Sequence, residues 1–180
     1  MILQQYKIVF AGSMGAGKTE AIRSLSEVPV LATEAFNTDS QAHNKMQTTV
    51  GIDYGEITLD DGVKIGLYGT PGQTRFDFIW PVICQGALGV IILIDHNSKL
   101  PLDELEGYLD TFKNYTKNIS IGITHMDENK GQPTSIYREW LIQNEYQYPL
   151  FFIDARKQEH VLLMIESLIA ALEVNLRATN

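Results

Sequence analysis

Apolar runs and amphipathic stretches alternate along the whole chain. Continuous apolar runs are typical of buried strands, and they occupy residues 6–11, 87–94, 119–124 and 149–153. Apolar positions at helical spacing predict helices over residues 18–25, 102–115, 133–144 and 161–176. Because strands and helices take turns, we expect an α/β sandwich around a mostly parallel sheet.

One segment departs from this alternation. Residues 51–59 and 63–68 flank Asp60-Asp61-Gly62, a turn signal that predicts a hairpin and therefore one antiparallel strand. Residues 29–47 follow neither the strand period nor the helix period, and a loop of that length in a compact domain is usually functional. We predict a three-layer sandwich with a six-stranded sheet, helices on both faces, and one domain over residues 1–180.

Composition and charge exclude several classes of function. The 22 acidic and 14 basic residues give a formal net charge of −8, which argues against nucleic acid as a partner. The single cysteine permits no intrachain disulfide, and the four histidines form no zinc-type cluster. Ile2 excludes N-myristoylation, the final residues carry no cysteine for prenylation, and no apolar run approaches a membrane span. We therefore expect a cytoplasmic protein without a direct lipid anchor.

The turn after the first predicted strand matches the phosphate-loop pattern G-x-x-x-x-G-K-[ST] in full. Its residues are Gly12, Ser13, Met14, Gly15, Ala16, Gly17, Lys18 and Thr19. Glycines let successive backbone N–H groups face one phosphate, and the following helix adds its positive dipole end. Lys18 can reach the β- and γ-phosphates, and the Thr19 hydroxyl can bind Mg²⁺. We expect nucleotide contacts from all eight residues and from Glu20.

Four further segments that can carry chemistry follow the phosphate loop along the chain. They are Thr48-Thr49-Val50-Gly51-Ile52-Asp53-Tyr54, Tyr68-Gly69-Thr70-Pro71-Gly72-Gln73-Thr74-Arg75-Phe76, Thr124-His125-Met126-Asp127 and Asp154-Ala155-Arg156. Together with the phosphate loop, they span nearly the whole chain. The chain thus resembles the Ras-like small GTPases. The motifs G-T-P-G-Q and T-H-x-D are most similar to those of a bacterial branch that includes the MglA-type polarity and motility GTPases.

This resemblance implies a GTPase that binds GTP or GDP with Mg²⁺. Thr49, with Thr48 as the neighbouring alternative, would bind Mg²⁺ together with Thr19. Gly72 would contact the γ-phosphate and Gln73 would orient the attacking water, so Gln73, Lys18 and Gly72 are the candidate catalytic residues. The guanine base would be read by Asp127, with further contacts from four other residues of the last two segments, Thr124, His125, Ala155 and Arg156.

The resemblance also implies partners. Without an obvious internal arginine finger, intrinsic hydrolysis should be slow, so a GTPase-activating protein is expected, and the resembled branch uses a roadblock-type dimer. Effectors would contact nucleotide-dependent switch loops at about residues 29–49 and 70–81. We interpret Arg75 as a solvated or structural arginine rather than as a finger.

Two residues keep other functions open. Gly69 stands where the superfamily has an aspartate that supports Mg²⁺, with Asp53 as a possible substitute, and this loss is compatible with a non-hydrolysing, nucleotide-gated binding module. Asp95 ends a predicted apolar strand, as in the P-loop kinases and ATPases, although capping of the following turn is the simpler interpretation.

Overall fold

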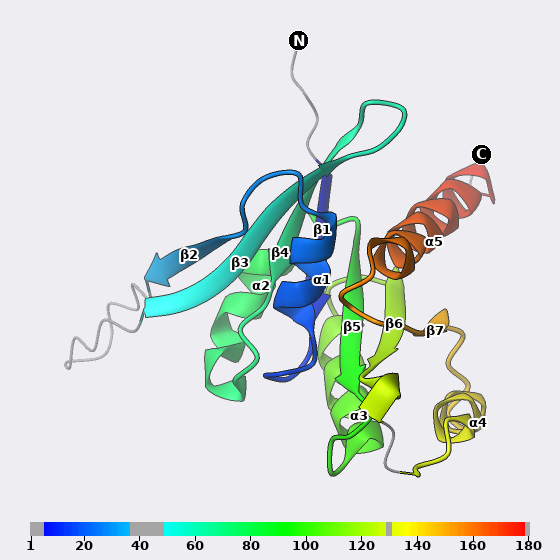
Figure 1. Ribbon diagram of the computed structural model, residues 1–180. Coiled ribbons are helices and arrows are strands. Elements are labelled where there is room, and N and C mark those ends of the chain that lie inside the picture. The colour runs from blue at the N-terminus through cyan, green and yellow to red at the C-terminus, as the bar shows by residue number, and fades with distance from the viewer. Residues whose placement is uncertain (1–5, 37–48, 129–130, 179–180) are drawn as a thin grey trace.

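A single mixed sheet organises the chain. The computed structural model describes residues 6–36, 49–128 and 131–178, and its sheet has the strand order β2-β3-β4-β1-β5-β6-β7 (Figure 1). The strands are β1 (Tyr6–Ala11), β2 (Leu31–Phe36), β3 (Thr49–Thr58), β4 (Lys64–Gly69), β5 (Gly89–Asp95), β6 (Ile119–Thr124) and β7 (Leu150–Phe152). The predicted fold class is confirmed: among these strands, β3 alone runs in the opposite direction to the others.

The sheet has seven strands, one more than predicted, because β2 lies inside the stretch expected to lack regular structure. All six of its residues pair with β3, from Leu31 opposite Tyr54 to Phe36 opposite Thr49. An edge strand of this kind is held by backbone hydrogen bonds to one neighbour, so it needs no apolar period of its own. Residues 37–48 of the predicted loop lie outside the described residues.

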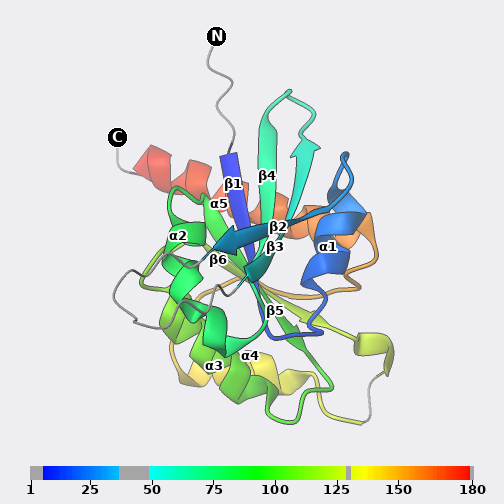
Figure 2. The same ribbon diagram turned by 90° about the vertical axis from the view of Figure 1, so that its left-hand side faces the viewer.

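Helices cover both faces of the sheet. On one face lie α1 (Lys18–Leu25) and α5 (Gln158–Ala178), and on the other lie α2 (Trp80–Cys84), α3 (Pro101–Phe112) and α4 (Ser135–Gln143). Figure 2 shows α1 and α2 on opposite sides of the sheet. Two 3₁₀ helices, η1 (Thr74–Ile79) and η2 (Met126–Glu128), complete the connections. No helix in the described ranges is long and apolar enough to cross a bilayer.

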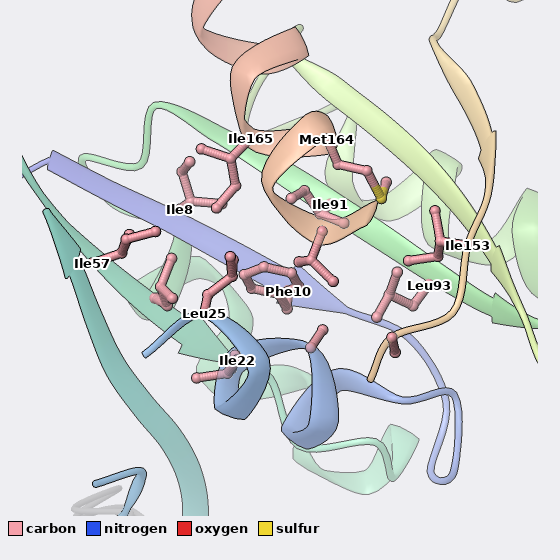
Figure 3. Packing of buried hydrophobic residues seen from close by; sticks show 14 of the residues in the cluster. Ile8, Phe10, Ile22, Leu25, Ile57, Ile91, Leu93, Ile153, Met164 and Ile165 are labelled. Carbon is pink, nitrogen blue, oxygen red and sulfur yellow. The ribbon is translucent and has the colours of Figure 1, made fainter. Parts of the chain in front are cut away.

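The central strands supply both cores. Side chains of β1 alternate between the faces, so Ile8 and Phe10 pack under α1 and α5 while Val9 packs under α2, α3 and α4. Figure 3 shows the first of these clusters, with Ile22 of α1 and Met164 of α5 converging on it. Each of these five side chains is fully buried. Burial of an aliphatic or aromatic side chain contributes about 1.5–3 kcal/mol, so the pattern that predicted the strands also fixes the layers.

The topology decides where a ligand can bind. β4, β1, β5, β6 and β7 are parallel, so their carboxyl ends meet at the same edge of the sheet. Open α/β sheets bind ligands at that edge, in the loops that follow the strands. The predicted phosphate loop, switch II and base-reading segments follow β1, β4, β6 and β7.

Candidate functional site

The phosphate loop forms the turn between β1 and α1 and depends on glycine backbone conformations. Gly12, Gly15 and Gly17 have φ values of 144°, 86° and 100°, which side-chain-bearing residues rarely adopt. A Cβ on Gly12 would also lie 2.3 Å from the carbonyl oxygen of Leu93 in β5. The loop therefore fits against the sheet only with glycine at position 12.

The side chain of Lys18, the first residue of α1, reaches back into the phosphate loop. Its ammonium donates hydrogen bonds of 2.7 Å to the carbonyl oxygens of Gly12 and Ser13, and the residue is only 7% exposed. Burial lowers the pKa of this ammonium from 10.5 to about 8, and the carboxylate of Asp53 opposes part of that shift. A buried cation at the start of a helix is a preformed site for an anion such as a phosphate group.

A carboxylate lies beside Thr19, and it comes from Asp53. The Thr19 hydroxyl donates a hydrogen bond to Asp53 Oδ2. Asp53 on β3 pairs directly with Gly69 on β4, and a Cβ added to Gly69 would lie 3.2 Å from the Asp53 Cβ. The carboxylate missing from residue 69 is thus replaced, in nearly the same place, by one from the neighbouring strand.

These groups fit a magnesium ion. Mg²⁺ prefers oxygen ligands and commonly uses only one or two protein groups together with phosphate oxygens and water. Thr19, Asp53 and Thr70 line one cavity with Lys18, and the buried Thr70 hydroxyl has no hydrogen-bond partner among the described residues. Thr49, the second predicted ligand, opens β3, but its side chain lies outside the described set, as does the whole of Thr48.

Switch II places Gly72 and Gln73 next to the phosphate loop. A Cβ on Gly72 would lie 2.5 Å from the Met14 backbone nitrogen, so the two segments approach as closely as glycine allows. Gln73 is exposed, and its side-chain nitrogen lies 4.0 Å from the Met14 sulfur. The two candidate catalytic residues of switch II therefore lie beside the phosphate loop.

Asp127, Ala155 and Arg156 gather at the other end of the site. Arg156 donates hydrogen bonds of 2.9 Å to Asp127 Oδ2 and of 2.8 Å to both oxygens of Asp154. These bonds hold the pKa of Asp154 well below its usual range, with the side-chain contact from Arg156 as the largest cause. Ala155 is buried and close to Gly17 of the phosphate loop, so the base end and the phosphate end touch.

Thr124 and His125 connect these two ends. The buried Thr124 hydroxyl lies 2.9 Å from the carbonyl oxygen of Ala16, so it braces the phosphate loop. His125 has a positive φ of 58°, and its Nδ1 lies 3.4 Å from an Asp95 carboxylate oxygen. Asp95 also caps the turn by accepting a bond from the Asn97 backbone nitrogen, as the simpler interpretation of that residue predicted.

Two neighbouring cavities join the predicted residues into one site. The cavity of about 350 Å³ at the phosphate end and the cavity of about 150 Å³ at the base end share Gly17, Glu20 and His125 in their linings. Lys18 belongs to the first and Asp127 to the second. An elongated ligand with a charged end and a planar end matches this shape.

One contact at the site has no signal in the sequence. Glu104 of α3 accepts hydrogen bonds from the hydroxyls of Ser13 and Ser98, and so fastens α3 to the phosphate loop. Ser13 and Glu104 are 91 positions apart, and neither residue type nor spacing indicates that they meet.

Comparison with known proteins shows similarity to nucleotide-binding families. A family model described as "Conserved hypothetical ATP binding protein" matches residues 10–112, more than half of the chain. Curated relatives include Ras-related protein Rab-8B of Homo sapiens, 31% identical over 63% of this chain and 47% of the relative. They also include Ras-related protein Rab-13 of Canis lupus familiaris, 29% identical over 67% of this chain and 54% of the relative.

A longer match is Ras-related protein Rab-18 of Caenorhabditis briggsae, 27% identical over 93% of this chain and 80% of the relative. The chain spans about half the length of the curated relatives named first. Among solved structures, the G domain of the T. maritima FeoB iron transporter superposes with a TM-score of 0.65. That match has 20% identity and covers 93% of this chain and 98% of the other, and at such identity it shows the fold alone.

Proposed function

This chain belongs to the family described as conserved hypothetical ATP binding proteins, and it is homologous to Ras-related small GTPases. On the premise of this homology, we propose that it is a guanine-nucleotide switch that hydrolyses GTP. The observation that carries this proposal is the position of Asp127. It lies in the cavity that adjoins the phosphate site, where a planar base would lie beside it. A carboxylate accepts two hydrogen bonds from the N1–H and amino group of guanine, whereas adenine has no such donor pair.

The phosphate end supplies the chemistry of hydrolysis. Phosphoryl transfer needs positioning and charge stabilisation more than covalent groups. Lys18 and the loop N–H groups hold the phosphates, Gly72 contacts the γ-phosphate, and Gln73 orients the attacking water. Thr19 and Asp53, with Thr49 as the further predicted ligand, would hold Mg²⁺, and the ion would neutralise phosphate charge.

Turnover is proposed to be slow without a partner. Negative charge develops on the phosphates during hydrolysis. Among the described residues that line the phosphate cavity, Lys18 is the one Lys or Arg side chain that can stabilise this charge. A GTPase-activating protein, of the roadblock-dimer type in the resembled bacterial branch, would supply what is missing. Effectors would contact residues 70–81 and about 29–49, whose arrangement depends on the γ-phosphate.

The test is titration of nucleotide-free protein with fluorescent GDP, GTP and ATP, with and without Mg²⁺. We expect guanine nucleotides to bind tightly and ATP weakly. Asp127→Ala should abolish guanine binding, while Asp60→Ala, an exposed carboxylate in the β3–β4 turn, should leave it unchanged. Preference for ATP, or equal loss in both variants, would overturn the proposal.

Turnover then separates a GTPase from a binding module that does not hydrolyse. We expect a single turnover of bound GTP to be measurable in the wild type and to be slower in Gln73→Ala. Tight binding of GTP with no phosphate release, alone or with candidate activating partners, would favour the non-hydrolysing module.

A further inference from the structure

Both polar ends of the Gln73 side chain are in contact with other residues. Arg75 Nε donates a hydrogen bond of 2.6 Å to Gln73 Oε1. On the other side, Gln73 Nε2 lies 4.0 Å from the Met14 sulfur, a weak acceptor on the phosphate loop. A glutamine at the surface ordinarily samples many rotamers, so these contacts select one direction for its amide.

Arg75 is itself held in place by its neighbour. Its guanidinium carbon lies 4.6 Å from the centre of the Phe76 ring, within the range of a cation–π contact. Among the described residues, Arg75 forms no salt bridge. The hydrogen bond to Gln73 is therefore the polar contact described for this guanidinium, and the Phe76 ring packs against it.

We propose that Arg75 is a positioning residue for GTP hydrolysis, which acts through the amide of Gln73 and not on the nucleotide; the inference rests on the proposed function. An amide oxygen has two lone pairs. The bond from Arg75 uses one and leaves the other to accept a hydrogen bond from the attacking water. The amide nitrogen is at the same time directed to the phosphate loop, on the side where the γ-phosphate is held.

This role differs from that of an arginine finger in a measurable way. A finger stabilises charge on the transferring phosphoryl group directly, so its loss slows hydrolysis whether or not the glutamine is present. A residue that acts through Gln73 has nothing to position once that side chain is removed. The two roles therefore differ in a double-mutant cycle.

The first experiment is single-turnover hydrolysis by the wild type, Arg75→Ala, Gln73→Ala and the double variant. We expect Arg75→Ala to lower the rate by roughly tenfold, because misplacement of a reacting group can cost up to about 100-fold. In the Gln73→Ala background, the same change should alter the rate by less than about twofold. The affinity for GTP should stay the same. Equal factors in both backgrounds would overturn the inference.

Two controls address packing and charge. Arg138 also lies over an aromatic ring, with its guanidinium carbon 5.9 Å from the centre of Phe152, far from Gln73. Arg138→Ala should leave hydrolysis unchanged. Arg75→Lys keeps the charge but lacks the planar Nε–H donor, so it should not restore the rate. Full rescue by lysine would show that charge, and not positioning, is what matters.

The second experiment is independent of turnover. Nitrogen-15 relaxation of the Gln73 side-chain amide in the GDP-loaded protein reports its order. We expect an ordered amide in the wild type and a mobile one in Arg75→Ala. If the wild type releases no phosphate but this change is seen, the proposed hydrolysis fails while the positioning by Arg75 stands. An unchanged amide in Arg75→Ala overturns the inference whatever the turnover.

Discussion

Moving one carboxylate across the β3–β4 strand pair tests the proposed metal site. The structure places Asp53 beside Thr19 and opposite Gly69, where a Cβ on residue 69 would contact the Asp53 Cβ tightly. Asp53→Asn keeps the shape of the side chain but removes its charge. We expect this variant to fold normally and to hold nucleotide less tightly when Mg²⁺ is limiting.

The expected size follows from the contacts of Asp53. A hydrogen bond to a charged group contributes about 1.5–3 kcal/mol. One unit charge about 4 Å from another, at an effective dielectric constant of about 20, adds at most about 4 kcal/mol. Because water compensates for part of this loss, we expect about 1.5–3 kcal/mol, which corresponds to a rise of roughly 10- to 150-fold in the Mg²⁺ concentration that half-protects bound GDP.

Moving the carboxylate from residue 53 to residue 69 provides a sharper test of the metal site. A Cβ on Gly69 would lie 3.2 Å from the Asp53 Cβ and 3.1 Å from Ile22 Cδ1, so Gly69→Asp alone should weaken the site through crowding and like charge. Asp53→Gly combined with Gly69→Asp removes that conflict and returns a carboxylate. We expect the double variant to recover much of the Mg²⁺ dependence that Asp53→Gly loses.

The assay is release of fluorescent GDP at a series of Mg²⁺ concentrations. Thermal unfolding of each nucleotide-free variant serves as the control for folding. If Asp53→Asn shifts the Mg²⁺ midpoint by less than about twofold, then Asp53 is only a structural partner of Thr19 and the proposed metal site is wrong. Failure of the double variant to recover, with normal folding, would contradict the replacement of residue 69 by Asp53.

Three further predictions concern the phosphate loop. The lowered pKa of Lys18 means that the unfolded chain binds its proton more tightly, so the contribution of Lys18 to stability rises by up to about 3 kcal/mol between pH 8 and 10.5. The unfolding free energy of the wild type minus that of Lys18→Met should therefore rise by that amount over the same range. Gly12→Ala should destabilise the nucleotide-free protein by more than about 2 kcal/mol, whereas Gly107→Ala, where a Cβ meets nothing within 4 Å, should be neutral or stabilising in chemical denaturation. Thr124→Val leaves the Ala16 carbonyl without its hydroxyl donor and should cost about 1–3 kcal/mol in the same experiment and speed GDP release.

Local sequence signals predicted most of the fold. The apolar runs and helical stripes specify buried faces, so the order of the layers follows from the chain itself. The final helix illustrates this, since Val161, Ile165 and Leu168 of its predicted stripe are all buried. β2 escaped prediction because its stability depends on backbone pairing with β3, a partner that the pattern of its own residues does not reveal.

The candidate site also combines features that local sequence predicts with features that depend on long-range packing. Its contiguous motifs were visible in the sequence, because the phosphate loop and the base-reading segment each carry their chemistry in a few adjacent residues. The contact of Ser13 with Glu104 was not visible, since it depends on how α3 packs. Asp53 is intermediate: the residue could be named as a substitute, but only the strand register places it next to Gly69.

The pairing of Asp53 with Gly69 has a consequence for the evolution of such proteins. Two positions 16 residues apart can supply the same carboxylate, and their side chains would be in tight contact across the strand pair. Selection should therefore act on the pair and not on either residue. Among homologues with this strand register we expect an acidic side chain at one of the two positions at least, and rarely at neither. A lineage could exchange one arrangement for the other only through an intermediate with a weakened ion site.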